Sequence, residues 1–180
     1  MYSLNVSKKI TTPFVDDRTD YVLKHPTVTV HATYGLRKTY KGLKPLIDNF
    51  IKNGKSVCIV TEKVTLSSHY NRTLKGLGFQ YYSDVQVSFT TKILLYIIVQ
   101  LYSLHRVESH YDVFICDEGL SLVQSFNYPT MHSRGLVMAR FSRLLQSSEY
   151  LVVCDADLSD VALTYSKSVQ EKNSMYLITH

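Results

Sequence analysis

The stretch that most constrains the fold is residues 111–119, YDVFICDEG. Four consecutive apolar residues at 113–116 lead directly into two acids, Asp117 and Glu118. An uninterrupted apolar run of this length predicts a strand buried on both faces, which is typical of a parallel sheet. Ligands of such sheets bind at the carboxyl ends of the strands. Asp117 is therefore expected to hold Mg²⁺, and Glu118 to polarise the nucleophile that attacks a phosphate. The alternative is an acidic turn that merely follows a core strand.

Strand and helix patterns alternate along most of the chain. Apolar and β-branched runs predict strands, and apolar residues at helical spacing, such as Leu43, Leu46 and Ile47, predict helices. This alternation predicts a three-layer α/β fold with a mainly parallel sheet. The expected strands are residues 27–32, 56–61, 93–100, 113–116, 150–154 and 175–179, with 79–84 as a short strand or loop. The expected helices are residues 43–51, 62–78, 101–107, 131–147 (with Val137, Met138, Phe141, Leu144 and Leu145 on one face) and 160–169.

The length and charge of the chain narrow its class. With 180 residues, the chain is expected to form one domain, residues 27–180, after a polar lead-in at residues 1–26. Residues 1–75 hold 13 Lys/Arg against 5 Asp/Glu, and this basic half suits a polyanion such as nucleic acid. No run is long enough to span a bilayer and the N-terminus lacks a signal-peptide core, so we expect an intracellular protein without a membrane partner. Cys58, Cys116 and Cys154 lack metal-ligand spacing and are expected to be buried thiols.

The turn after the first expected core strand has the layout of a phosphate-binding loop. Gly35 lies in the turn, and Lys38 and Thr39 precede the helix. In such loops backbone N–H groups cradle phosphates, the lysine neutralises them, and the Thr hydroxyl binds Mg²⁺. The match departs from the full pattern because Arg37 occupies the position of the second glycine. Pro45 is also expected to weaken the following helix.

In order and spacing, these segments resemble herpesvirus-type replication-origin-binding helicases of superfamily 2. The resemblance is to the first RecA-like lobe of their motor. Residues 34–39, YGLRKT, stand where that family has a phosphate-binding loop. Residues 116–118, CDE, resemble its acid motif, and residues 154–159, CDADLS, stand where most superfamily members carry Ser-Ala-Thr. Residues 60–66, VTEKVTL, and 98–106, IVQLYSLHR, resemble two segments that contact a single nucleic-acid strand.

The resemblance implies a role for each matching residue. ATP and Mg²⁺ would bind at the loop and the acid pair, and Asp155 and Asp157 would sense the γ-phosphate. It also implies that the strand leading into residues 154–159, here called the third motif, lies between the strand before the phosphate-binding loop and the strand before the acid pair. The backbone of single-stranded DNA would be held by Lys63, Thr65, Ser103, His105 and Arg106.

The family binds ATP between two RecA-like lobes, and the second lobe supplies an arginine. The chain is expected to end about where the first lobe finishes, so a second lobe is an implied partner. Three functions remain open on the sequence. They are an ATP-binding motor lobe, a degenerate nucleic-acid-binding module without ATP turnover, and a small stand-alone P-loop phosphotransferase. Arg37 favours the second, whereas intact Lys38, Thr39, Asp117 and Glu118 favour the first.

Overall fold

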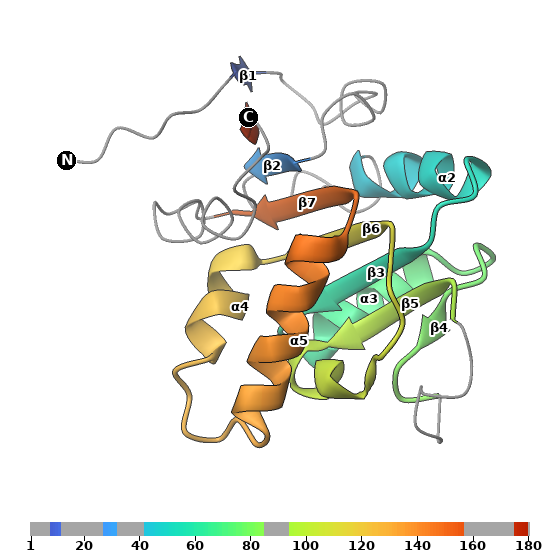
Figure 1. Ribbon diagram of the computed structural model, residues 1–180. Coiled ribbons are helices and arrows are strands. Elements are labelled where there is room, and N and C mark those ends of the chain that lie inside the picture. Colours follow the sequence, from blue (N-terminus) through green and yellow to red (C-terminus); the bar gives the residue numbers. More distant parts are fainter. Residues whose placement is uncertain (1–7, 12–26, 32–41, 85–93, 157–174, 180) are drawn as a thin grey trace.

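The protein is known from a computed structural model, which describes residues 8–11, 27–31, 42–84, 94–156 and 175–179 (Figure 1). In this part of the chain, eight strands form one sheet in the order β1-β8-β2-β7-β6-β3-β5-β4. Every neighbouring pair of strands is parallel. The strands are β1 (Lys8–Thr11), β2 (Thr27–His31), β3 (Val57–Thr61), β4 (Gln80–Tyr81), β5 (Tyr96–Gln100), β6 (Val113–Asp117), β7 (Tyr150–Asp155) and β8 (Met175–Thr179).

Helices cover both faces of this sheet. Figure 1 shows α4 and α5 together in front of it, with α3 behind. This arrangement confirms the predicted three-layer α/β architecture. The helices in the described part of the chain are α2 (Lys44–Lys52), α3 (Val64–Thr73), the 3₁₀ helix η2 (Leu101–Arg106), α4 (Gly119–Ser125) and α5 (Arg134–Ser147).

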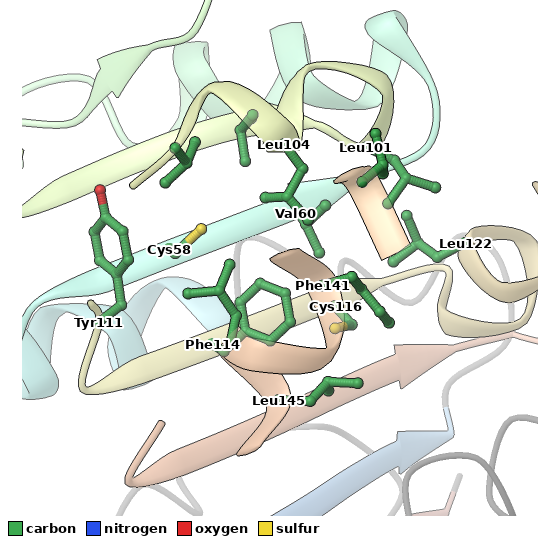
Figure 2. Packing of buried hydrophobic residues seen from close by; sticks show 14 of the residues in the cluster. Cys58, Val60, Leu101, Leu104, Tyr111, Phe114, Cys116, Leu122, Phe141 and Leu145 are labelled. Atoms are coloured by element: carbon green, nitrogen blue, oxygen red, sulfur yellow. The ribbon is translucent and has the colours of Figure 1, made fainter. Parts of the chain in front are cut away.

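Alternate side chains of each central strand belong to two different cores. In β6, Phe114 and Cys116 pack under α4, α5 and η2 (Figure 2), whereas Val113 and Ile115 pack under α2 and α3. All five residues of β6 are buried, which explains why its sequence has no polar alternation. The strand that ends in the acid pair is therefore held rigidly from both sides.

The three cysteines are buried free thiols, as predicted. Burial raises the pKa of Cys58 and of Cys116, so these side chains stay neutral and act as small apolar groups in the core.

Several predicted elements differ in detail from the structure. Pro45 does not weaken α2, because it lies in the first turn, where the backbone N–H has no partner within the helix. Helix α5 begins at Arg134 rather than at residue 131, because turns occupy residues 126–131. Met138 is 40% exposed and does not belong to the core face, where Arg140 is buried instead. Helix α4, directly after the acid pair, was not predicted.

Other predicted boundaries shift by a few residues. Strand β7 extends one residue further than predicted and includes Asp155. The expected strand at 93–100 begins at Tyr96. The predicted helix at 160–169 lies outside the described residues. In the described part of the chain, no helix combines the length and apolarity needed to cross a bilayer.

Candidate functional site

The carboxyl ends of the central strands bring the predicted functional segments to one edge of the sheet. Strand β7 lies between β2 and β6, as the resemblance implies. His31 at the end of β2 is in register with Asp155 of β7, and Asp117 of β6 is in register with Cys154. The ends of β2, β7 and β6 therefore lie next to each other, and these are the strands that precede or carry the predicted nucleotide-binding residues.

Asp117 is buried at this edge and is held by a residue that the sequence did not indicate. The carboxylate is 1% exposed. The hydroxyl of Tyr70, on α3, donates a hydrogen bond of 2.7 Å to Asp117 Oδ2. Tyr70 is itself fully buried, so this bond forms away from water, where a bond to a charged acceptor is strong.

Glu118 and Gly119 form a tight junction between β6 and α4. Glu118 has φ of 60°, in the left-handed region that non-glycine residues rarely adopt. A side chain at Gly119 would meet Val153 Cγ1 at 2.6 Å, so only glycine lets α4 approach β7 this closely. Backbone strain of this kind clusters at functional sites, which supports the assignment of Glu118.

Asp155 is connected to this junction. It is 2% exposed, and its Oδ2 accepts a hydrogen bond of 2.6 Å from the backbone N–H of Leu120. Leu120 lies in the first turn of α4, where backbone N–H groups have no partner within the helix. The structure thus brings Asp155 to the start of the helix that follows Asp117 and Glu118.

The first predicted nucleic-acid segment lies at the start of α3. Lys63 is the N-cap residue of α3 and Thr65 lies in its first turn, and both side chains are exposed. A buried hydrogen bond of 2.5 Å between the hydroxyls of Thr61, at the end of β3, and Ser67, on α3, attaches this segment to the sheet.

The second predicted segment lies beside the first, because Gln100 connects them. Its Nε2 donates to the carbonyl oxygen of Glu62 at 3.1 Å, directly before Lys63. Its Oε1 accepts a hydrogen bond of 3.0 Å from Tyr82. Gln100 is followed at once by η2, which carries Ser103, His105 and Arg106. His105 is exposed, and Ser103 and Arg106 are partly exposed.

The remaining predicted site residues lie outside the described part of the chain. They are Gly35, Arg37, Lys38, Thr39 and Asp157. The residues that sequence reasoning missed are Tyr70, Tyr82, Gln100 and Gly119. For Tyr70 the one signal was its place on the buried face of a helix, since a buried tyrosine hydroxyl usually has a partner.

The described acids fit a magnesium ion that is held mainly by a nucleotide. Among the described residues, no group of three or more His, Cys, Asp or Glu could hold a metal. Mg²⁺ in nucleotide sites commonly uses only one or two carboxylates together with phosphates and waters. The carboxylate of Asp117, which accepts the hydrogen bond from Tyr70, has the chemistry required of such a group.

Comparison with solved structures supports the same fold. The protein is similar to the Sulfolobus solfataricus SWI2/SNF2 ATPase core in complex with dsDNA, with a TM-score of 0.60, 14% identity, and coverage of 82% of this chain and 32% of that one. It is also similar to an S. cerevisiae Dbp5 variant bound to Nup159, a Gle1 variant, IP6 and ADP. That match has a TM-score of 0.63 and 14% identity, and covers 93% of this chain and 48% of that one. These matches confirm a RecA-like α/β fold.

Comparison with known sequences identifies the relatives. The chain is 28% identical over 165 residues to the replication origin-binding protein of human herpesvirus 6A (strain Uganda-1102), covering 87% of this chain and 20% of the relative. It is 30% identical over 142 residues to that of psittacid herpesvirus 1, covering 74% of this chain and 16% of the relative. The chain thus spans at most a fifth of the length of these two relatives. Residues 7–172 match the family model described as origin of replication binding protein, and the chain belongs to this family.

Proposed function

We propose that the chain is the ATP-binding first motor lobe of an origin-binding DNA helicase, which works with a second RecA-like lobe. The observation that carries this proposal is the strand order β2-β7-β6, with all three strands parallel. This order puts the end of β2, which precedes residues 35–39 in the sequence, next to the ends of β7 and β6, as a shared nucleotide site requires. Family membership favours this function over a stand-alone phosphotransferase.

The proposed roles follow from the chemistry of each group. Lys38 would neutralise the outer phosphates, and Thr39 with Asp117 would hold Mg²⁺, which supplies charge neutralisation when bound. Glu118 would orient the attacking water. The carboxylate of Asp155 accepts a hydrogen bond from the first turn of α4. A shift of this carboxylate towards the phosphates would therefore move the start of α4, directly after the acid pair.

Single-stranded DNA is the proposed second ligand. Lys63, Thr65, Ser103, His105 and Arg106 belong to two segments that Gln100 connects at the same edge of the sheet. Cations there would supply salt-dependent affinity for phosphates, and hydroxyls would fix the register of the strand.

Nucleotide binding is tested by titrating a fluorescent ATP analogue with Mg²⁺ into the wild type and Lys38→Ala. Lys75→Ala is the matched control, because Lys75 is an exposed lysine in a turn after α3. We expect weak binding by the wild type, a loss in Lys38→Ala, and no change in the control. Equal binding by all three proteins would remove the 35–39 loop from the nucleotide site. Arg37→Gly should tighten binding if the side chain obstructs the phosphates.

A degenerate nucleic-acid-binding module is the second candidate function, and Arg37 in place of a glycine is the observation that favours it. It predicts single-strand binding without any nucleotide binding by the wild type or by Arg37→Gly. In either case, the 180-residue chain alone is expected to show negligible ATPase activity. An arginine from the opposite side of the nucleotide is typically worth about 10³–10⁵ in rate.

A further inference from the structure

A buried arginine on α5 forms no ion pair within the described part of the chain, although the charge of Glu108 favours its protonated form. Arg140 is 8% exposed, and its Nη2 donates to the carbonyl oxygen of Ser109. Its Nε is buried and has no hydrogen-bond partner among the described residues. Arg140 belongs to neither of the ion pairs Lys52–Asp48 and Lys55–Glu149, which lie elsewhere in the described residues. Leaving a buried donor of a cation without a partner is costly, and a bound water or ion is one of the explanations that such a group calls for.

Arg140 lines an open pocket between α5 and η2 with a volume of about 400 Å³. Arg143, one turn further along α5, and His105, on η2, line the same pocket. Glu108 is the one acid among its lining residues. Burial lowers the pKa of Arg140, and the like charge of Arg143 lowers it further, whereas Glu108 acts in the opposite direction. An anion between Arg140 and Arg143 would reduce the repulsion between the two cations and would accept hydrogen bonds from guanidinium N–H groups such as Nε of Arg140.

We propose that this pocket holds a backbone phosphate of the single-stranded DNA whose path passes η2. Its continuity with the proposed DNA surface favours this occupant, since His105 belongs to both. The planar guanidinium fork suits a phosphate, and apolar lining residues such as Leu136, 65% exposed, offer a surface for the attached sugar. The inference rests on the proposed single-strand binding and extends that surface from η2 onto α5, where the sequence assigned no site.

The test measures single-strand binding by fluorescence anisotropy at several salt concentrations. Arg143→Gln removes an exposed pocket cation, and Ala139→Trp fills the pocket without changing the charge. The matched controls are Arg72→Gln, an exposed arginine on α3, and Met138→Trp, an exposed residue of α5 that does not line the pocket. These positions are used because Arg140 is buried and its replacement would also perturb the fold.

We expect Arg143→Gln and Ala139→Trp each to weaken binding and to reduce the log–log salt slope by about 0.7, the value for one phosphate contact of a single strand. Both controls should bind like the wild type. If Ala139→Trp binds like the wild type, no phosphate enters the pocket and the inference is wrong, even if Arg143→Gln acts through long-range charge.

A double variant, Lys63→Ala with Arg106→Ala, separates this inference from the proposed function. If the double variant loses affinity while both pocket variants bind normally, the DNA surface stands and the pocket assignment fails. Absence of wild-type binding overturns both. A last experiment measures the melting temperature of the protein in inorganic phosphate and in chloride at equal ionic strength. If phosphate stabilises the wild type but not Ala139→Trp, and neither pocket variant changes DNA binding, the pocket binds another oxyanion, such as an acidic side chain of a partner protein, and not DNA.

Discussion

Replacing Tyr70 by phenylalanine isolates one hydrogen bond at the candidate site. The substitution keeps the ring, which fills the core under α3, and removes the hydroxyl that donates to Asp117 Oδ2 at 2.7 Å. Both residues are at most 1% exposed, so water cannot simply replace the donor. A hydrogen bond to a charged group contributes about 1.5–3 kcal/mol, so we expect the free energy of unfolding to fall by about 2 kcal/mol.

Urea denaturation at pH 7 measures this change. For a chain of this size, a loss of about 2 kcal/mol corresponds to a melting temperature lower by about 4–8 °C. The matched control is Tyr128→Phe, since Tyr128 is 45% exposed. Its loss of a hydroxyl should change stability by less than about 0.5 kcal/mol. If the two variants are equally stable, the buried bond makes no net contribution and the reasoning fails.

The same variant tests the orientation of Asp117 towards a metal. Hydrogen bonds to metal-binding carboxylates typically affect metal affinity or activity by about 10–100-fold. We therefore expect Tyr70→Phe to weaken the Mg²⁺-dependent part of ATP-analogue binding and to leave Mg²⁺-free binding unchanged. An equal loss with and without Mg²⁺ would show that Tyr70 acts through the general packing of the site.

Two further predictions concern stability. Gly119→Ala should lower the free energy of unfolding by about 1–3 kcal/mol, because its Cβ would lie 2.6 Å from Val153 Cγ1. Its control, Gly135→Ala, adds a Cβ in open space on α5 and should raise the free energy of unfolding by up to about 1 kcal/mol. If urea denaturation shows the reverse order of stability, the packing at α4 is wrong. Burial raises the pKa of Asp112, but the Ser56 backbone N–H and hydroxyl and the charge of Lys55 outweigh it and hold the pKa below its ordinary value. A folded-state pKa that is lowered stabilises the fold at pH values above the unfolded-state pKa, and this stabilisation is lost as the pH falls through the folded-state pKa. The stability difference between the wild type and Asp112→Asn should therefore shrink from pH 6 towards about pH 3. A difference that stays constant with pH would refute this prediction.

The strands were predictable because a parallel sheet covered on both faces needs apolar side chains on both. In β6 and β7 this requirement leaves a continuous apolar run that ends at Asp117 and Asp155, so the sequence itself marks the carboxyl ends of these strands. Helix limits were less predictable. The start of α5 depends on turns at residues 126–131, and apolar Met138 lies exposed while charged Arg140 is buried.

The contacts that organise the site could not be read from the sequence. Tyr70 and Asp117 are 47 residues apart, and Leu120 and Asp155 are 35 apart, so their pairing depends on how α3 and α4 pack on the sheet. The left-handed conformation of Glu118 is also a tertiary effect, because propensity disfavours it. Motif matching found the residues with chemistry, and packing supplied the residues that orient them.

Helix α3 physically connects the two proposed ligand sites. Its N-cap residue, Lys63, belongs to the proposed DNA surface, and seven residues later Tyr70 bonds the proposed metal-binding acid. At about 1.5 Å per residue this is roughly 10 Å of rigid helix. The bond between Thr61 and Ser67 fixes the first turn of α3 to the end of β3, which pairs with β6. Lys63 and the Tyr70 hydroxyl therefore belong to one packed unit that is attached to the sheet carrying Asp117. Packed helices of this kind are among the elements that can carry coupling between sites, and α3 extends from one proposed site to the other.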